Sequence, residues 1–275
     1  MAARRNLLVG FLAVALLALA ARPMLSGFVR SSLYPAPPVR VPSPPPPLEE
    51  LALELDSAPL SAWWLPPADE DAPVVLMLHG NGENLETLRR SGLFDRFARL
   101  GAAVLALDYP GYGRSGGSPA EDSIAAATRR AWGEIVERAG DDRPRVAIGW
   151  SLGAAAAARL AADEAATVDA VILASPWTTL AEVAAVHFPA WLTGPLLGDR
   201  YDNLSAAGEI HCPTLVVHGE LDTLVPVEHG RRVFAAFGGP KRWLEVEGAG
   251  HNDLFARDET WRAIAAALEG ARRGR

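Results

Sequence analysis

The residues best suited to chemistry in this 275-residue chain are centred on a serine between two glycines, Gly149-Trp150-Ser151-Leu152-Gly153. An apolar run precedes this motif, and an alanine-rich stretch with helical character follows it. A strand that turns sharply into a helix exposes a serine hydroxyl above a sheet, and flanking glycines tolerate the crowding of such a turn. The pattern therefore predicts that Ser151 is a nucleophile, in preference to a residue of an ordinary strand-to-helix turn.

A serine hydroxyl becomes an effective nucleophile only when a neighbouring base accepts its proton. After a serine in such a turn, an acid and then a histidine are expected further along the chain. Asp222 follows a predicted strand, and His251 lies in a glycine-rich loop after the last predicted strand. We therefore predict that Asp222 and His251 complete the site, with Glu220 as an alternative acid and His229 as an alternative base.

The oxyanion that forms during acyl transfer needs two fixed hydrogen-bond donors. The backbone N–H of Leu152, next to the nucleophile, is predicted to be the first donor. The loop His79-Gly80-Asn81-Gly82-Glu83-Asn84 follows another predicted strand, and its glycines allow a close approach of the backbone. The N–H of Asn81 is predicted to be the second donor, with Gly80 as the alternative, and His79 is predicted to be structural.

A second glycine-rich segment, Asp108-Tyr109-Pro110-Gly111-Tyr112-Gly113-Arg114-Ser115-Gly116-Gly117, is similar to a phosphate-binding loop. It lacks the Lys-Ser/Thr pair that closes such a loop, and the helix after it starts late. We therefore interpret it as a rigid loop that walls the active-site pocket. Cys212 is the only cysteine, so neither an intramolecular disulfide nor a cysteine-based zinc site can form.

The elements that must position these residues follow from the apolar pattern beyond residue 51. Strands are predicted at residues 74–78, 102–107, 145–149, 170–174, 214–217 and 242–246, after an antiparallel pair at 51–56 and 61–65. Helices are predicted at residues 84–100, 120–139, 152–162, 227–237 and 253–268. Apolar strands separated by helices are typical of an α/β fold, in which a mostly parallel sheet has helices on both faces and its site at the strands' carboxyl ends.

One connection in this α/β pattern is unusually long. It joins the strands that end at residue 174 and begin at residue 214, and it is rich in apolar and aromatic residues. Because ordinary connections are much shorter, we predict a small helical cap at about residues 176–210. A helix followed by a long surface loop is the alternative.

The N-terminal part of the chain differs in composition from the rest. Residues 7–21 form an uncharged run of 15 residues after Arg4 and Arg5, shorter than the roughly 20 residues of a typical membrane span. The run could continue past Arg22 to residue 29. We predict that residues 1–30 are an uncleaved single-pass membrane anchor with the catalytic domain outside the cytoplasm; a cleaved signal peptide and secretion are the alternative.

A proline-rich linker is predicted at residues 31–48, followed by one catalytic domain at residues 49–275. Residues 1–48 carry five arginines and no acid, so the formal charge of −7 divides into +5 there and −7 − 5 = −12 in the remainder. Nucleic-acid binding requires a basic surface. The acidic domain is therefore not expected to bind nucleic acid.

Five segments together resemble the α/β-hydrolase superfamily over about residues 51–270. They are HGNGEN at 79–84, DYPGYGRSGG at 108–117, GWSLG at 149–153, HGELDTLVP at 218–226 and GAGHNDL at 248–254. They are similar to a branch of small, N-terminally membrane-anchored hydrolases with a serine-aminopeptidase-like domain, related to eukaryotic lysophospholipid lipases and protein depalmitoylases. One departure is Ser57-Ala58-Pro59, where the family commonly has a glycine-containing turn between the first two strands.

This resemblance implies an α/β-hydrolase fold without a cofactor, a triad of Ser151, Asp222 and His251, and an oxyanion hole formed by the amides of Leu152 and Asn81. We therefore predict a serine hydrolase that cleaves esters or thioesters through an acyl-enzyme. Lipid-like acyl groups are the expected substrates, because the anchor would place the site near a bilayer and the predicted cap is apolar.

Two alternatives to this function remain open at the level of the sequence. The first is an aminopeptidase, in which Glu182 or Asp199 of the predicted cap would hold the amine of the substrate. The second is a catalytically silent, membrane-tethered binding protein that has kept the hydrolase fold.

Overall fold

The structure, a computed structural model, describes residues 33–35, 37, 39–188 and 197–274. The predicted anchor at residues 1–30 lies outside these residues. Among the described residues, none of the helices combines the length and the apolar character that a membrane crossing requires.

The core of the molecule is an eight-stranded sheet with the strand order β1-β2-β4-β3-β5-β6-β7-β8. β1 and β2 run antiparallel to their neighbours, and the pairs from β4 to β8 are parallel, as the sequence predicts. The strands are β1 (Glu49–Leu55), β2 (Ala58–Leu65), β3 (Val74–Leu78), β4 (Ala103–Leu107), β5 (Arg145–Trp150), β6 (Ala170–Ala174), β7 (Thr214–Gly219) and β8 (Lys241–Val246).

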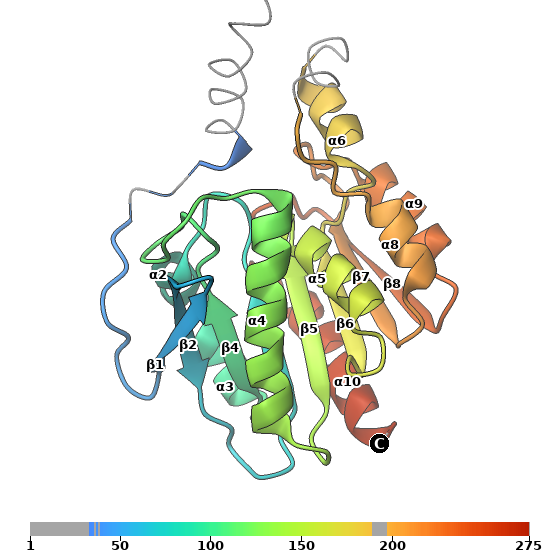
Figure 1. Ribbon diagram of the computed structural model, residues 1–275. Coiled ribbons are helices and arrows are strands. Elements are labelled where there is room, and N and C mark those ends of the chain that lie inside the picture. The colour runs from blue at the N-terminus through green and yellow to red at the C-terminus, as the bar shows by residue number, and fades with distance from the viewer. Residues whose placement is uncertain (1–32, 36, 38, 189–196, 275) are drawn as a thin grey trace, which may run out of the picture.

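Helices cover both faces of this sheet, as predicted, with α4 and α5 in front and α10 behind in Figure 1. Alternate side chains of one strand enter different cores: Leu76 packs on one face of β3, and Val75 and Met77 pack on the other. The first core contains residues of α4 (Glu121–Ala139), α5 (Leu152–Asp163) and α9 (Val227–Ala236). The second contains residues of α2 (Leu85–Arg90), α3 (Leu93–Arg99) and α10 (Asp258–Arg273).

The prediction of one continuous helix at residues 84–100 is wrong. The segment folds as two short helices, α2 and α3, separated by Gly92 in the left-handed conformation, with φ 75°. The N–H of Gly92 bonds to the carbonyl of Arg89 and ends the first helix. Glycine adopts positive φ without steric cost, so one helix can end at Gly92 and the next can begin directly after it. The apolar pattern continues on both sides of this break and therefore does not reveal it.

The last predicted helix also begins later than expected. Residues Leu254–Ala256 form a short 3₁₀ turn, and α10 starts only at Asp258. His251 and the residues just after it thus remain in a loop at the carboxyl end of β8.

The hairpin between β1 and β2 shows how a turn without glycine is made. Asp56 and Ser57 occupy the turn with φ 49° and 65°, and Leu55 pairs with Ala58 across it. Positive φ at both central residues is the requirement of a type I′ turn, whose twist suits a hairpin. The hairpin therefore forms although its turn contains no glycine.

The long connection after β6 carries helical structure, as predicted. It contains α6 (Leu180–His187) and α8 (Asn203–Glu209), while residues 189–196 lie outside the described part. α6 stands above the body of the molecule in Figure 1, and α8 packs against α5 and α9.

Candidate active site

The turn between β5 and α5 holds Ser151 in an uncommon conformation, with φ 55° and ψ −112°. Only glycine fits without a clash at the two positions that flank the turn, 149 and 153. A Cβ on Gly149 would overlap the carbonyl group of Gly153, and a Cβ on Gly153 would overlap the carbonyl group of Leu78. The strand-to-helix turn predicted from the sequence is therefore present. Strain of this kind persists only where the surrounding structure enforces it, and it occurs preferentially at functional sites.

The structure brings Ser151, His251 and Asp222 into one hydrogen-bonded chain, although they lie at the ends of three different strands. The hydroxyl of Ser151 lies 3.0 Å from Nε2 of His251. Nδ1 of the same ring lies 2.7 Å from Oδ2 of Asp222. All three side chains are buried, with relative exposures of 6%, 8% and 5% in this order. This geometry lets the imidazole accept the serine proton while the carboxylate orients the ring.

The carboxylate of Asp222 is held on both oxygens. Oδ1 accepts hydrogen bonds from the amides of Leu224, at 3.0 Å, and Val225, at 2.8 Å. Burial raises the pKa of Asp222, but hydrogen bonds from His218, His251 and the Val225 amide outweigh it and hold the pKa well below its ordinary value. The carboxylate is therefore ionised at neutral pH and fixed in orientation.

Ser175 is a residue of this site that the sequence analysis missed. Its hydroxyl donates to Oδ2 of Asp222 at 2.9 Å, and its side chain is fully buried. It follows the last residue of β6, next to β7 in the sheet, and its φ of 47° is also unusual. Its position directly after a buried strand, where functional groups of an α/β sheet gather, was the available signal.

Aromatic packing supports His251 from the side. The ring of Trp150 lies 5.6 Å from that of His251, and Phe255 packs edge-on against Trp150 at 5.9 Å. The glycine-rich loop around the histidine is closed by Asp253, which accepts a hydrogen bond from the N–H of Gly250 at 2.6 Å. These contacts restrict the orientation of the imidazole.

The alternative acid and base are engaged elsewhere. Glu220 is exposed and accepts the N–H of Gly248. Nδ1 of His229 lies 2.9 Å from the hydroxyl of Thr178, and burial lowers the pKa of His229. His251, rather than His229, is therefore the base that contacts Ser151, and Asp222, rather than Glu220, is the acid that contacts His251.

In the loop after β3, Asn81 lines the cavity at Ser151, whereas Gly80 is not among its described lining residues. The N–H of Gly80 already donates to Oε2 of Glu83 at 3.1 Å. Asn81 and Leu152 both line the cavity into which Ser151 opens. The Leu152 amide is the first of α5, where an N–H has no acceptor within the helix. The placement of both residues is compatible with the predicted oxyanion hole.

His79 is part of the framework of this loop. It is fully buried, and burial lowers its pKa to about 4, so the ring is neutral at neutral pH. Its ring packs against Tyr109 and Tyr112, and the hydroxyl of Tyr109 donates to the carbonyl of His79 at 2.9 Å. These contacts make His79 structural.

The segment 108–117 supports the site indirectly. The expectation that it walls the pocket is not met, because none of its residues lines the cavity at Ser151. The hydroxyl of Tyr112 instead donates to Oδ1 of Asn81 at 2.6 Å, and the carboxylate of Asp108 accepts the amides of Leu85 and Arg114. The segment thus holds the loop after β3 in place.

The cavity at Ser151 has a volume of about 250 Å³ and a mostly apolar lining. Its described lining residues are Leu33, Tyr34, Asn81, Ser151, Leu152, Trp177, Leu180, Val183, Ala184, His187, Phe188, Tyr201, Leu224 and Val225. This set contains no carboxylate, lysine or arginine. A neutral, apolar group is therefore the ligand that fits it.

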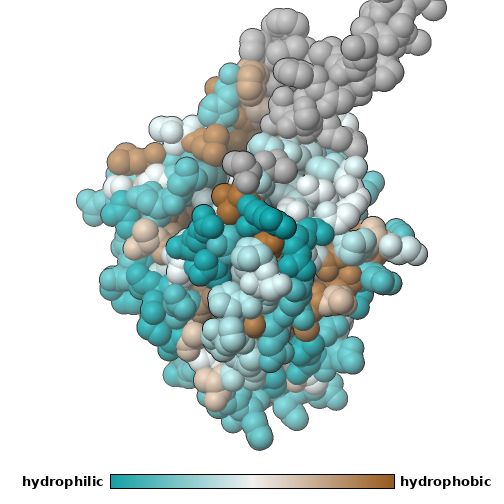
Figure 2. All heavy atoms as spheres, turned by 90° about the vertical axis from the view of Figure 1, so that its left-hand side faces the viewer, coloured by the Kyte–Doolittle hydropathy of each residue, from teal (hydrophilic) through white to brown (hydrophobic). Residues whose placement is uncertain are grey.

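Two apolar residues of this lining are also strongly exposed on the surface. Val186, Phe188, Leu221 and Leu224 are the large hydrophobic side chains that are strongly exposed among the described residues, and two of them, Phe188 and Leu224, line the cavity. The side of the body that carries β1 is hydrophilic over most of its area (Figure 2). Exposed apolar surface thus occurs next to the candidate site.

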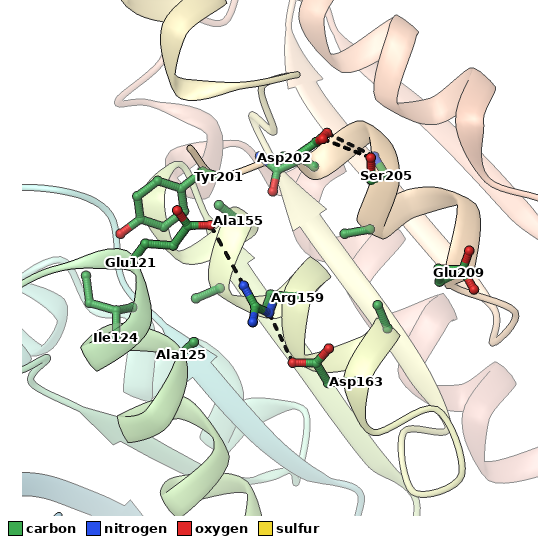
Figure 3. Close-up of a pocket in the computed structure, with 14 residues that line it drawn as sticks. Glu121, Ile124, Ala125, Ala155, Arg159, Asp163, Tyr201, Asp202, Ser205 and Glu209 are labelled. Carbon is green, nitrogen blue, oxygen red and sulfur yellow. Dashed lines mark hydrogen bonds and ion pairs between the residues drawn. The ribbon is translucent and has the colours of Figure 1, made fainter. Parts of the chain in front are cut away.

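A second cavity, of about 360 Å³, lies between α4, α5 and α8 (Figure 3). Arg159 projects into it between Glu121 and Asp163, at 3.9 Å and 3.1 Å from their carboxylates. Its lining contains no histidine to activate a nucleophile. Although it is larger than the cavity at Ser151, its side chains do not form a site for acyl transfer.

Other reactive groups do not form a further site in the part of the chain that the structure describes. Burial raises the pKa of Cys212 to about 11, so its thiol stays protonated. No group of three or more His, Cys, Asp or Glu side chains in that part could hold a metal ion.

Known proteins resemble this chain in sequence over most of its length. The family model for the alpha/beta hydrolase fold matches residues 73–200. An uncharacterized protein of Mycobacterium tuberculosis is 38% identical over 200 residues, which cover 72% of this chain and 70% of that protein. The chain therefore belongs to the alpha/beta hydrolase family.

Two further proteins are similar to the chain in part or in fold. Lysophosphatidylserine lipase ABHD12 of Danio rerio is 31% identical over 188 residues, which cover 62% of this chain but only 49% of the lipase. The structure of the Pyrococcus furiosus esterase Pf2001 matches with a TM-score of 0.67 and 21% identity, covering 85% of this chain and 98% of the esterase. The predicted fold class is confirmed.

Proposed function

We propose that this protein is a serine hydrolase that cleaves carboxylic esters or thioesters of lipid-like acyl groups. The observation that carries the proposal is the hydrogen-bonded chain from Ser151 through His251 to Asp222, which opens into an apolar cavity. The nucleophile and its base, and the base and its acid, are within hydrogen-bond distance.

In the first half of the reaction, Nε2 of His251 accepts the hydroxyl proton of Ser151 as Oγ attacks the carbonyl carbon of the substrate. The amides of Leu152 and Asn81 donate to the resulting oxyanion, and a donor of this kind is worth about 3–4 kcal/mol to the transition state. Asp222 stabilises the imidazolium through Nδ1. The imidazolium then gives its proton to the leaving alcohol or thiol, and the acyl group remains on Oγ.

In the second half, water replaces the leaving group. His251 accepts a proton from the water as its oxygen attacks the acyl carbon, and the same two amides hold the new oxyanion. When this intermediate collapses, the proton returns from His251 to Oγ of Ser151. The carboxylic acid leaves, and the free enzyme is restored.

The lining of the cavity supports an apolar acyl group as the substrate. An apolar chain gains free energy on burial, about 0.8 kcal/mol per methylene, whereas a charged substrate group would find no ionic partner among the described lining residues. The names of the similar proteins, an esterase and a lysophosphatidylserine lipase, agree with hydrolysis of an ester.

The described residues give no specific support for an aminopeptidase. The carboxylate of Glu182 is paired with Arg232 at 2.7 Å, and that of Asp199 accepts the hydroxyl of Tyr34 at 2.6 Å. Neither acid lines the cavity at Ser151. An amine held there would therefore lack the anionic partner that this function requires.

Labelling with a fluorophosphonate probe tests the proposed function directly. The wild-type chain is expected to label at Ser151 and to hydrolyse p-nitrophenyl acyl esters faster than aminoacyl anilides. Ser151→Ala should abolish labelling and turnover, while Ser205→Ala, at a serine outside the cavity, serves as the matched control. Preference for the anilides would replace this function with the peptidase, and a folded wild-type chain that does not label would indicate a binding protein.

We also propose that residues 1–30 anchor the protein in a membrane with the catalytic domain outside the cytoplasm. The uncharged run at residues 7–21, preceded by two arginines, supports this placement. An anchored chain should stay with the membrane fraction after carbonate extraction, and protease added to intact cells or spheroplasts should degrade its catalytic domain. Recovery of a shortened chain in the medium would instead indicate a cleaved signal peptide.

A further inference from the structure

Residues Leu33, Tyr34 and Pro35, here called the N-terminal strap, lie against the loop that follows β3. Nδ2 of Asn81 donates to the carbonyl of Leu33 at 2.6 Å. Gly82 of the same loop faces Pro35, whose carbonyl would be 3.8 Å from a Cβ at that position. The strap comes from the proline-rich segment predicted as a linker, yet it touches the residue proposed to bind the oxyanion.

A hydroxyl network fixes the strap to the other side of the cavity. The Tyr34 hydroxyl donates to Oδ2 of Asp199 at 2.6 Å, and it lies 2.9 Å from the Tyr201 hydroxyl. Because the single proton of Tyr34 is engaged by Asp199, Tyr201 is the donor in the second bond. Oδ1 of Asp199 accepts the amide of Glu121 at 3.2 Å, which links the network to the start of α4.

The two tyrosines are built into this site. Their relative exposures are only 6% for Tyr34 and 5% for Tyr201. Burial also raises the pKa of both hydroxyls, so that both remain protonated and act as neutral hydrogen-bonding groups. The two rings are therefore buried, and their hydroxyls bond to each other and to Asp199.

The two tyrosines lie at the boundary of the cavity at Ser151. Leu33 and Tyr34 line the cavity at Ser151, and Tyr201 lines both this cavity and the one between α4, α5 and α8. The side chain of Tyr201 thus stands between the two spaces, and Tyr34 is bonded to it. Leu33 and Tyr34 precede β1, so this part of the wall comes from a segment outside the central sheet.

We propose that Tyr34 and Leu33 of the N-terminal strap, with Tyr201, form the wall that limits the length of the acyl group bound at Ser151. This inference rests on the proposed function and specifies its substrate. A chain that reaches the tyrosine pair has to stop there, whereas a smaller side chain at position 34 leaves room for further methylenes. Specificity for acyl length is then set partly by a segment outside the α/β body.

Two variants of the full-length chain test this in opposite directions. Tyr34→Ala enlarges the cavity, and Leu33→Trp fills it from the half-buried strap. The readout is the ratio of kcat/KM for a p-nitrophenyl dodecanoate to that for the acetate. Tyr34→Ala should raise this ratio about tenfold, as expected when about two more methylenes are buried, and Leu33→Trp should lower it by a similar factor.

The matched control is Val186→Ala. Val186 is 46% exposed on α6 and does not line the cavity, so its truncation should leave the ratio within about twofold of wild type. A thermal melt of each variant establishes that it is folded, and Leu33→Trp decides the matter if Tyr34→Ala does not fold.

The inference is overturned if the folded variants keep the wild-type ratio, or if Val186→Ala shifts it as much as they do. These outcomes differ from failure of the proposed function itself. In that case the wild-type chain would neither label at Ser151 nor hydrolyse any of the esters. Labelling and ester turnover with an unchanged length profile would count against the strap alone.

Discussion

The two cavities of this protein share Tyr201 as a wall but differ in chemistry. The cavity between α4, α5 and α8 is the larger, and Arg159 lies among carboxylates there. The cavity at Ser151 is smaller and apolar, but it contains a nucleophile in hydrogen-bond contact with a base. The difference shows that strand ends, rather than the volume between helices, bring reactive groups together.

Such convergence has a topological origin. Parallel strands end at the same edge of the sheet, so residues distant in sequence meet there. Ser151, Asp222 and His251 follow β5, β7 and β8 in this way. The helices around the other cavity present side chains along their flanks, where oppositely charged residues pair and neutralise one another.

Among the residues that support the nucleophile of the apolar site, the largest expected effect is at its acid, Asp222. Asp222→Asn should lower kcat/KM for a p-nitrophenyl ester by about 10⁴-fold, because an amide cannot hold the imidazole in the tautomer that accepts the serine proton. Thermal melting of the variant shows whether the fold is retained. A folded variant with more than a tenth of wild-type activity would contradict the role of Asp222.

A smaller effect is expected at Ser175, which positions the acid. Ser175→Gly removes the hydroxyl that donates to Asp222 and tolerates the positive φ, so kcat/KM should fall about tenfold. With one donor fewer, the carboxylate interacts more strongly with His251, and the acidic limb of the pH–rate profile should move to higher pH. Ser175→Thr, which keeps a hydroxyl, should recover part of the activity; an unchanged pH profile in the glycine variant would argue against positioning.

Glu83 is expected to make stability depend on pH. Burial raises its pKa from 4.5 to about 7, although its carboxylate accepts the N–H of Gly80. The folded state therefore binds the proton more tightly than the unfolded state, and stability declines as the pH rises from about 4.5 to about 7. One pKa unit corresponds to about 1.4 kcal/mol, so the free energy of unfolding should fall by at most about 3 kcal/mol.

Glu83→Gln should remove this contribution and keep an acceptor for Gly80. Urea unfolding at pH 5 and pH 8 measures it: the difference in unfolding free energy between the two pH values should be smaller in the variant than in wild type. If both proteins lose the same stability, Glu83 is not the titrating group.

The smallest effect is expected in the larger cavity. Arg159→Met breaks the ion pairs with Glu121 and Asp163, but the arginine side chain is 45% exposed, so the loss in stability should be about 1 kcal/mol or less. Turnover of p-nitrophenyl acetate should stay within about twofold of wild type. A large fall in activity with an intact fold would contradict the conclusion that the two cavities differ in their chemical role.

Much of the fold could be predicted because its local signals agree with one another. The apolar runs that form β3 and β6 were predicted with the observed boundaries, since buried parallel strands are apolar throughout. The break at Gly92 was missed because the apolar period continues on both sides of it. Local pattern thus predicts elements better than it predicts their interruptions.

The same distinction applies to the candidate site: residues with a distinctive local pattern were predicted, and residues without one were missed. Ser151, Asp222 and His251 were identified from their types, order and positions after strands, and the structure brings them together. Ser175 and Tyr34 escaped notice because an isolated serine or tyrosine has no distinctive pattern. Their relevance depends on partners 47 and 165 residues away, Asp222 and Asp199.

The amino-acid sequence by itself determined the order of strands and helices, the sharp turn at Ser151 and the identity of the groups able to transfer a proton. These features depend on steric demands and apolar periods within a few neighbouring residues. Only the tertiary structure decided which distant side chains meet: that Ser175 holds Asp222, that Glu220 does not, and that Tyr34 reaches Tyr201. The physical reason is that such contacts follow from how strands and helices pack, and hydrogen bonds form only between groups that the packing brings within about 3 Å.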